Sequence, residues 1–462
     1  MTKPPHSSNQ IAPKSEAEAF FKANPDIDAV DIIFTNMSGV PRGKRLRQHE
    51  ALAVYENGRF LPGSVLVVDI TGRDTEETGL VWEDGDADRS CLPVPGTLVR
   101  APWLGDKAAQ FTTSYYELDG TPNDLDPRHV LGRVIDRLAA EGLTPVVAVE
   151  LEFFLLEMDS GRPVIARGLT SGEKPIGNDC YSLRELEDFK PFFDDLYAAC
   201  DAQNVPLESG ISEYAPGQFE LTLRHKADAL RATDDAVMYK RIVKGVAAQH
   251  GMIASFMAKP YVDQAGNGMH LHVSMADKDG NNAFASDEPE GSPMLRHAIG
   301  GMKALLGESM AIFAPNANSY RRFKANSYAP VAPTWGVNNR TVSLRVPAGP
   351  PASRHVEHRV CGADANPYLA VAALLAAMHH GITNRIDPGP AIVGNGYEQA
   401  PDDTRLPNHW ASAIEALKGS ELLRDYLGDR FITQYCIVKE VEMARFMAEV
   451  TQLDYDWYLN NA

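Results

Sequence analysis

The chain has 462 residues, of which 44% are apolar, and it carries a formal net charge of −18. This length exceeds what one hydrophobic core usually supports, so we expect two domains. The acidic charge argues against nucleic acid or an anionic membrane as a partner, because both require basic surface. The five cysteines form no CxxC pair, which argues against a zinc ribbon and favours a reducing compartment.

The first ten residues, MTKPPHSSNQ, contain no apolar stretch, so we expect no signal peptide and a cytoplasmic protein. The most apolar run, residues 368–378, is too short to cross a bilayer. We therefore expect this run to be a buried helix and the protein to have no membrane partner.

Short β-like segments dominate residues 17–115, which we predict to be an N-terminal domain. DAVDIIFTNMSG (residues 28–39) and SVLVVDITG (residues 64–72) are typical of strands followed by glycine turns. Residues 106–127 are rich in Gly, Asp and Pro and mark the predicted boundary. Residues 120–462 form the predicted second domain.

Two helices have clear sequence signals. Asp126 and Pro127 suit the start of the first helix, and Gly142 suits its end. Asn366 and Pro367 begin the second helix, which we expect to end near Gly381.

A repeated pattern of polar residues two positions apart occurs in five strand-like segments. Side chains alternate across a strand, so each set shares one face: Glu150 and Glu152; Gln218, Glu220 and Thr222; His270, His272 and Ser274; Thr341, Ser343 and Arg345; His355, Glu357 and Arg359. An antiparallel sheet with one solvated face would give the same alternation. These sets, however, are dominated by Glu, His and Arg and contain no Lys. Clustered carboxylates repel one another, and divalent cations are the simplest remedy.

The residue types indicate the chemistry. Carboxylates with few nitrogens and no thiolates favour Mg²⁺ or Mn²⁺ over zinc. Four arginines lie in or near the same segments and suit phosphate oxygens: Arg322, Arg340, Arg345 and Arg359. Metal-binding carboxylates beside arginines are typical of phosphoryl transfer. The chain has no GxxxxGK[ST] or GxGxxG motif, so any ATP is held without a P-loop or a Rossmann turn.

Six segments resemble the motif set of the type I glutamine synthetase superfamily: ELEFFLL, EYAPGQFE, GNGMHLHVS, NSYRR, NNRTVSLRVP and HVEHRVCGADANPYLA. The resemblance implies an α+β fold, with a small β-grasp-like N-terminal domain before a large catalytic domain built on a curved antiparallel sheet. It also implies a homo-oligomer, usually a dodecamer of two stacked rings, whose active sites are shared between neighbours.

The resemblance assigns roles residue by residue. Positions matching the ligands of the first metal are Glu152, Glu213 and Glu220, and those matching the second are Glu150, His270 and Glu357. Glu208, His272 and Ser274 match nucleotide-contacting positions, Gly266, Arg322 and Arg359 match glutamate-holding ones, and Arg340 and Arg345 match phosphate-holding ones. His355 stands where the family usually has a nucleotide-contacting arginine. The implied reaction uses ATP with Mg²⁺ or Mn²⁺ to phosphorylate the γ-carboxylate of L-glutamate, which an amine then attacks.

Two departures from glutamine synthetase proper concern the ammonium site. The N-terminal turn reads LPGSVLVVD and has no acid, and the flap reads NSYAP, with Tyr328 in place of a glutamate. The same variants resemble γ-glutamylpolyamine synthetases and their monoamine-using relatives. We therefore predict an organic amine as substrate, in particular a polyamine such as putrescine or spermidine. Tyr397 is expected to be a surface residue of a loop.

Four alternatives remain open. The chain could be an ammonia-using glutamine synthetase or a ligase for a monoamine. It could also be a phosphotransferase that releases an acyl phosphate, or a catalytically silent family member that acts as a binding protein.

Overall fold

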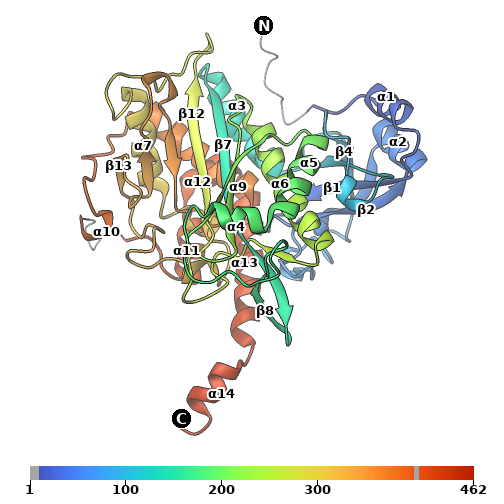
Figure 1. Cartoon of the computed structure of the whole chain (residues 1–462). Helices are drawn as coiled ribbons and strands as arrows, with labels where there is room; N and C mark the ends of the chain where they lie inside the picture. Colours follow the sequence, from blue (N-terminus) through green and yellow to red (C-terminus); the bar gives the residue numbers. More distant parts are fainter. Residues whose placement is uncertain (1–9, 400–404) are drawn as a thin grey trace.

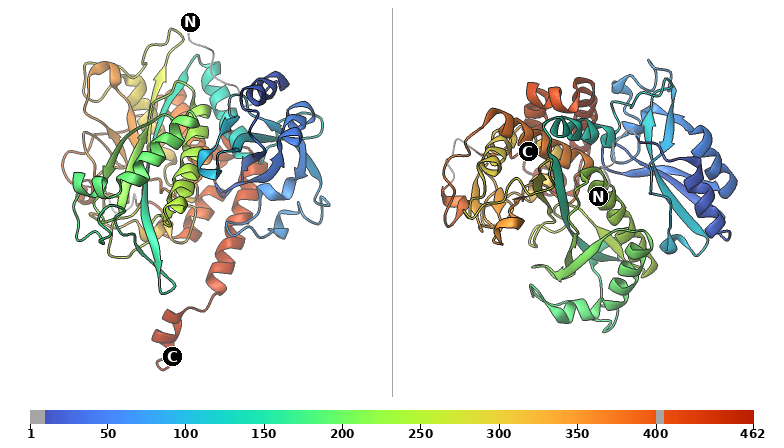
Figure 2. Two further views of the ribbon diagram at one scale, coloured as in Figure 1. Left: turned by 45° about the vertical axis from the view of Figure 1, so that its right-hand side comes forward. Right: turned by 90° about the horizontal axis from the view of Figure 1, so that it is seen from above.

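A computed structural model describes residues 10–399 and 405–462. Residues 1–9, on which most of the expectation about a signal peptide rests, lie outside this range. Figures 1 and 2 show a smaller part beside a larger one, with the helix α14 projecting away from the body. Among the helices described, none is long and apolar enough to span a bilayer.

The smaller part contains a six-stranded sheet in the order β2-β1-β6-β4-β3, with β5 beside β6. Its strands are β1 (Ala29–Thr35), β2 (Pro41–Arg47), β3 (Arg59–Pro62), β4 (Asp88–Pro93), β5 (Val99–Arg100) and β6 (Ala108–Tyr116). β1 and β6 are parallel, and the other pairs are antiparallel. The helices α1 (Lys14–Ala23) and α2 (Gln48–Asn57) contribute Phe21 and Val54 to a core against Phe111 of β6. This mixed sheet with its helices fits the predicted β-grasp-like fold.

The strand predicted for residues 64–72 is wrong. Gly63–Leu66 form a short 3₁₀ helix instead, and Val67 donates its amide to the carbonyl of Ser64 at 2.9 Å. Leu66 and Val67 are consecutive and both fully buried, which a strand with one solvated face does not allow. The amide of Ile70 donates to the carboxylate of Glu442 at 2.7 Å, so helix α13 takes the place of a neighbouring strand.

The larger part is built on a nine-stranded sheet in the order β13-β14-β15-β12-β7-β10-β9, with β8 and β11 also beside β7. Its strands are β7 (Thr144–Asp159), β8 (Arg162–Ile165), β9 (Leu207–Ser212), β10 (Gln218–Leu223), β11 (Ile253–Ser255), β12 (Met269–Ala276), β13 (Trp335–Val337), β14 (Leu344–Val346) and β15 (Val356–His358). Every pair is antiparallel except β13 with β14. The α+β class and the large antiparallel sheet are confirmed. The domain limits at 17–115 and 120–462 stay a prediction.

Helices cover the apolar side of this sheet and continue beyond it. They are α3 (Pro127–Ala140), α4 (Leu183–Asp188), α5 (Lys190–Ala202), α6 (Ala229–Gln249), α7 (Pro293–Leu305), α8 (Met310–Phe313), α9 (Pro367–Asn384), α10 (Gly396–Gln399), α11 (Trp410–Lys418), α12 (Glu421–Leu427), α13 (Asp429–Ala448) and α14 (Gln452–Tyr458). Val149, Leu151 and Phe153 of β7 are fully buried in the core that β7 shares with α3, α6 and α9. The opposite side of β7 is thereby left for polar residues.

The predicted helix starts are confirmed, but one predicted end is wrong. The side chains of Asp126 and Asn366 cap α3 and α9 by accepting backbone amides. α9 does not end at Gly381 but runs on to Asn384. A Cβ at Gly381 would lie 2.2 Å from the carbonyl oxygen of His297 on α7. This glycine therefore allows close packing of two helices and does not terminate one.

Candidate active site

The polar face of the large sheet is assembled by strand register. Glu152 of β7 lies opposite Glu220 of β10, and Glu150 lies opposite His270 of β12. Farther along the sheet, Glu357 of β15 pairs with His272 of β12 and with Arg345 of β14. Directly opposed residues have Cβ atoms only about 5 Å apart. The register therefore brings carboxylates from three strands, with two imidazoles, into one cluster.

The cluster contains overlapping groups of potential metal ligands. One ligand atom from each member lies within 4.8 Å of the others in three groups: Glu152, Glu213 and Glu220; Glu150, Glu220 and His270; Glu150, His272 and Glu357. Nδ1 of His270 is 3.3 Å from Glu150 and 3.8 Å from both Glu220 and Glu357. All six predicted metal positions therefore meet in one place, although Glu213 follows the end of β9 and had no strand pattern to mark it.

Burial and mutual repulsion perturb these acids. Burial, reinforced by Glu150 and Glu152, holds the pKa of Glu220 well above its usual range. Burial and the charge of Glu152 raise the pKa of Glu213 to about 7. Burial also disfavours ionisation of Glu150, but hydrogen bonds from His270 and His272 outweigh it and lower the pKa of Glu150. A cluster that resists full ionisation, with mostly oxygen donors and two imidazoles, fits hard divalent cations.

Because the raised pKa of Glu213 reports a destabilising charge, we predict how metal binding depends on pH. In the unfolded chain Glu213 loses its proton near pH 4.5, whereas in the folded, metal-free protein it keeps the proton up to about pH 7. The free energy of unfolding of the metal-free protein therefore falls as pH rises between these two values. A cation removes that penalty, and its binding competes with the proton. The rise in melting temperature on adding Mg²⁺ or Mn²⁺ should grow between about pH 5.5 and about pH 8. Glu213→Gln should flatten that dependence, and an unchanged profile would contradict the assignment.

Three of the four predicted arginines border the cluster. Glu357 is 1% exposed and accepts hydrogen bonds from Arg359 and, at 2.8 Å, from Arg345. Burial alone would raise the pKa of Glu357, but Arg359 and His270 lower it to about 2. Arg322 is buried and donates to the carbonyl of Val360 at 2.8 Å. Glu357 is thus ionised at neutral pH and holds two guanidinium groups toward the site.

Glycines make room for Arg322. A Cβ at Gly266 would lie 2.8 Å from Cγ of Arg322, and one at Gly268 would lie 2.8 Å from Nη2. The same Cβ at Gly266 would lie 2.6 Å from the backbone carbonyl oxygen of Ala258, so this position is restricted to glycine, whereas at Gly268 the nearest atom is the flexible end of the arginine. Arg340, by contrast, is exposed, and its charge reaches the cluster only by lowering the pKa of Glu213.

The nucleotide-contacting residues predicted by resemblance lie at one edge of the cluster. His272 contacts Glu150 at 3.1 Å and His355 at 3.0 Å, and Ser274 follows on the same strand. Glu208 of β9 is exposed and accepts a hydrogen bond from Arg224 at 2.9 Å.

Sequence reasoning missed His225. Its ring lies within 6 Å of His272 and His355, centroid to centroid, at 5.9 Å and 5.6 Å. His225 follows the end of β10, after an irregularity of register between Leu221 and Leu223, so no alternating pattern could mark it.

The predicted strand face at residues 341–345 is only partly correct, because β14 begins at Leu344. The hydroxyl of Thr341 accepts the amide of Gly396 at 2.8 Å. The hydroxyl of Ser343 is buried and donates to the carbonyl of Ala332 at 2.5 Å. Both hydroxyls are thus used in local loop contacts, and only Arg345 of this set reaches the acids.

The two segments that depart from glutamine synthetase have defined environments. Tyr328 is 62% exposed and has a left-handed backbone with φ of 56°. Tyr397 is half-buried on the short helix α10 and its hydroxyl is buried, so the expectation of a surface residue of a loop is wrong. In the N-terminal turn, the hydroxyl of Ser64 bonds the carboxylate of Asp86 at 2.5 Å. An acid therefore lies beside this turn, although the turn itself has none.

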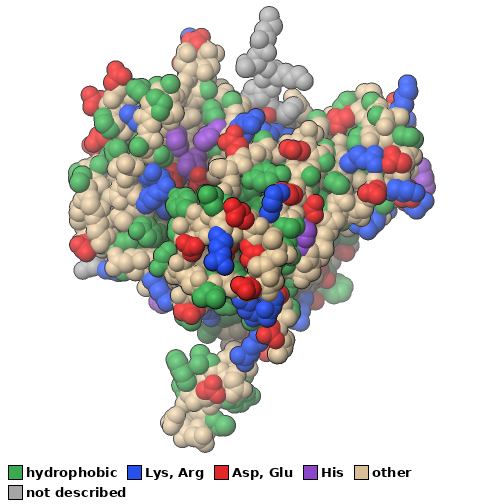
Figure 3. Space-filling view, viewed as in Figure 1, with side chains coloured by type: hydrophobic (Ala, Val, Ile, Leu, Met, Phe, Trp, Pro, Cys, Tyr) green, Lys and Arg blue, Asp and Glu red, His purple; other side chains and the backbone are tan. Residues whose placement is uncertain are grey.

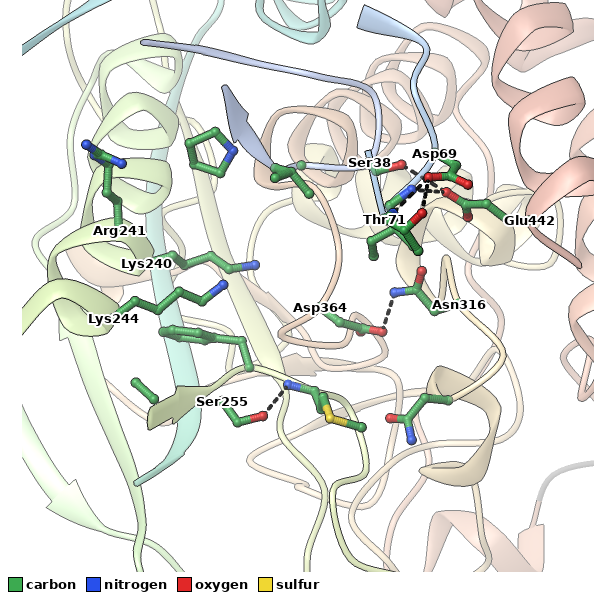
Figure 4. Close-up of a pocket in the computed structure, with 18 of the residues that line it drawn as sticks. Ser38, Asp69, Thr71, Lys240, Arg241, Lys244, Ser255, Asn316, Asp364 and Glu442 are labelled. Atoms are coloured by element: carbon green, nitrogen blue, oxygen red, sulfur yellow. Dashed lines mark hydrogen bonds between the residues drawn. The ribbon is translucent and has the colours of Figure 1, made fainter. Parts of the chain in front are cut away.

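A cavity of about 930 Å³ lies elsewhere, between α6, α13 and the loops that follow β1 and the 3₁₀ helix Gly63–Leu66. Figure 4 shows Lys240 and Lys244 of α6 on one side and Asp69 and Glu442 on the other. None of the predicted site residues lines it. The carboxylate cluster, not this cavity, therefore carries the candidate chemistry.

Comparison with known proteins decides the family. Residues 124–458 match the glutamine synthetase catalytic domain. The chain belongs to the glutamine synthetase family. It is 39% identical over 452 residues to the γ-glutamylputrescine synthetase PuuA of Escherichia coli (strain K12), a match that covers 97% of this chain and 95% of the relative.

Other members of the family also match over nearly their whole length. The γ-glutamylethanolamide synthetase GlnA4 of Streptomyces coelicolor is 36% identical, with 95% of this chain and 93% of the relative covered. The glutamate–isopropylamine ligase of a Pseudomonas species is 33% identical, with 94% and 95% covered. The structure of GmaS without ligand superposes with a TM-score of 0.83 at 28% identity, covering 96% of this chain and 99% of GmaS.

Proposed function

We propose that this glutamine synthetase family member is an ATP-dependent ligase that joins the γ-carboxylate of L-glutamate to an organic amine. One observation carries the proposal: a cluster of carboxylates bordered by arginines, in a chain that matches three glutamate–amine ligases over more than nine-tenths of its length. This combination fits the first step of such a ligation, in which the negatively charged terminal phosphoryl group of ATP is transferred to glutamate.

The carboxylate cluster would hold two divalent cations. In this proposal Glu152, Glu213 and Glu220 hold one, and Glu150, His270 and Glu357 hold the other. Bound Mg²⁺ or Mn²⁺ neutralises charge on phosphate oxygens. The chain's own contribution is to fix the acids by strand register and to balance them with Arg345 and Arg359.

The remaining residues would bind the substrates. We assign Glu208, His272, Ser274 and His355 to the nucleotide, Arg340 and Arg345 to its phosphates, and Gly266, Arg322 and Arg359 to glutamate. A γ-carboxylate oxygen of glutamate attacks the terminal phosphorus of ATP, and ADP leaves. The amine nitrogen then attacks the carbonyl carbon of γ-glutamyl phosphate, phosphate leaves, and the nitrogen loses a proton. Phosphorylation is required because a free carboxylate is a poor acyl donor, and the phosphate supplies the leaving group that it lacks.

The flap and the N-terminal turn favour an amine larger than ammonia. Tyr328 presents an exposed ring where glutamine synthetases carry an acid, and no acid stands within the turn at Gly63 and Ser64. Aromatic surface accepts the carbon chain of an amine. We propose a polyamine such as putrescine, with a monoamine as the second candidate because one relative is named for isopropylamine and another for γ-glutamylethanolamide.

The test is phosphate release from ATP with L-glutamate and a panel of ammonium, ethanolamine, isopropylamine, putrescine and spermidine, with each product identified by mass spectrometry. We expect organic amines to be used at least about tenfold better than ammonium, which corresponds to about 1.4 kcal/mol. Turnover with ammonium alone would overturn the amine assignment. Acyl phosphate trapped by hydroxylamine without any amide product would indicate a phosphotransferase, and absence of nucleotide binding would indicate a binding protein.

Tyr328 offers a specific prediction. Tyr328→Glu should shift the ratio of ammonium to putrescine turnover by roughly tenfold or more toward ammonium, because a carboxylate stabilises a small cation nearby. Tyr328→Phe keeps the ring and serves as the matched control, with the amine profile of the native chain. An unchanged ratio in Tyr328→Glu would remove this residue from the amine pocket.

We also propose a cytoplasmic homo-oligomer, with a dodecamer as the expected form. Light scattering coupled to gel filtration measures its mass, and a monomer at enzyme-assay concentrations would contradict this proposal.

A further inference from the structure

Three histidines meet at the edge of the carboxylate cluster: His225 after β10, His272 on β12 and His355 just before β15. Nδ1 of His272 is 3.0 Å from Nε2 of His355, and one ring nitrogen from each of the three lies within 4.8 Å of the others. Figure 3 shows histidine side chains gathered in one patch over β7 and β12. His225 is exposed, so this patch is open to solvent.

The outer nitrogens of two of these rings lie close to oxygen atoms. Nδ1 of His355 lies 2.7 Å from the carbonyl oxygen of Ser353, which can only accept, so this nitrogen carries the proton and Nε2 offers a lone pair. Nε2 of His272 lies 3.1 Å from a carboxylate oxygen of Glu150, which leaves Nδ1 directed at His355. Histidines that bind metals donate their second N–H to a carbonyl or carboxylate, as His355 does to Ser353.

We propose that His225, His272 and His355 form a binding site for a transition metal ion, Zn²⁺ above all, which adjoins the carboxylate sites through the contact of His272 with Glu150. Imidazole ligands favour Zn²⁺, Co²⁺ or Ni²⁺ over Mg²⁺ and Mn²⁺. Two nitrogens of a tetrahedral zinc site lie roughly 3.3 Å apart, from Zn–N bonds of about 2.0–2.1 Å, close to the separation between His272 and His355. The fourth position faces solvent and is open to water or an anion.

This site has a consequence for the enzyme that rests on the proposed function. His272 and His355 are residues that the proposed function assigns to the nucleotide. A Zn²⁺ ion held between them would occupy part of the nucleotide site. The ion should therefore compete with ATP and inhibit the ligase, and excess Mg²⁺ should not displace it.

The test uses the full-length protein, saturated with Mg²⁺ and titrated with Co²⁺ as a spectroscopic probe. We expect a single Co²⁺ ion per chain to bind with the visible absorption of tetrahedral nitrogen coordination, and Zn²⁺ to abolish that absorption. His225→Ala and His355→Gln should each weaken Co²⁺ binding by roughly a hundredfold or more, given that loss of even an outer hydrogen-bond partner costs 10–100-fold. His49→Gln, at an exposed histidine of α2, is the matched control and should bind as the native chain does.

The outcomes separate the metal site from the proposed function. Co²⁺ binding that neither histidine variant weakens would overturn the metal site, as would absence of tetrahedral absorption. Release of Co²⁺ by ATP would support both proposals. Binding that the His225 and His355 variants weaken but that resists ATP would support the metal site and overturn the assignment of His272 and His355 to the nucleotide.

Discussion

Replacing Glu220 with glutamine should lower ligase turnover at least about a thousandfold, because a metal-binding carboxylate contributes several kcal/mol of charge stabilisation. Glu220 belongs to two of the ligand groups, one with Glu152 and Glu213 and one with Glu150 and His270. Strand register places Glu220 directly opposite Glu152, and these are the two acids of the cluster that face each other across neighbouring strands. Its loss should therefore disturb both proposed cations.

The same substitution should make the metal-free protein more stable, not less. Burial and the neighbouring Glu150 and Glu152 hold the pKa of Glu220 above its usual range, so its charge opposes folding at neutral pH. The neutral amide removes that repulsion at nearly constant volume. We expect a higher melting temperature without metal and a smaller increase on adding Mg²⁺.

Glu157→Gln is the matched control for this experiment. Glu157 lies on β7 beyond the cluster and contacts Arg167 at 3.5 Å on the protein surface. Turnover and metal response should stay within about twofold of the native chain, since partly exposed ion pairs contribute little. Near-normal turnover in Glu220→Gln would remove Glu220 from the site, whatever its effect on stability.

The second large effect concerns the helices behind the sheet. Asp234→Ala should destabilise the chain by about 3–5 kcal/mol, because it leaves the buried charge of Arg128 without its partner. Arg128 of α3 donates to both carboxylate oxygens of Asp234 on α6, at 2.9 Å and 3.1 Å. The hydroxyl of Tyr368 on α9 donates to the same carboxylate at 2.7 Å. Arg128 and Asp234 are only 4% and 6% exposed.

Chemical denaturation at constant protein concentration, followed by near-ultraviolet circular dichroism, measures this effect. Asp425→Ala is the control, because Asp425 pairs with Arg137 at the surface and is 67% exposed. It should cost less than about 1 kcal/mol. The double variant Arg128→Met with Asp234→Leu should recover most of the loss, since apolar residues replace a buried pair without leaving a charge. A loss below about 1 kcal/mol in Asp234→Ala would show that the pair does not hold the helices together.

The sequence by itself determined which residues face the site on the central strands. The alternation around Glu150, Glu220 and His270 depends only on the two-residue period of a strand, and the structure retains it. The starts of α3 and α9 were equally local, because Asp126 and Asn366 cap backbone amides two residues away. Local geometry of this kind depends only on residues that are close together in the sequence.

Tertiary structure decided the features that depend on distant partners. Strand register placed Glu220 opposite Glu152 and brought His225 beside His272, which no local pattern encodes. Residues 64–72 formed a 3₁₀ turn and a loop because α13 supplied the acceptor for the amide of Ile70, and α9 continues past Gly381, where α7 packs closely against it. Apolar runs and single glycines permit several conformations. The conformation adopted is the one in which neighbouring elements form hydrogen bonds with the buried backbone groups and pack against the side chains.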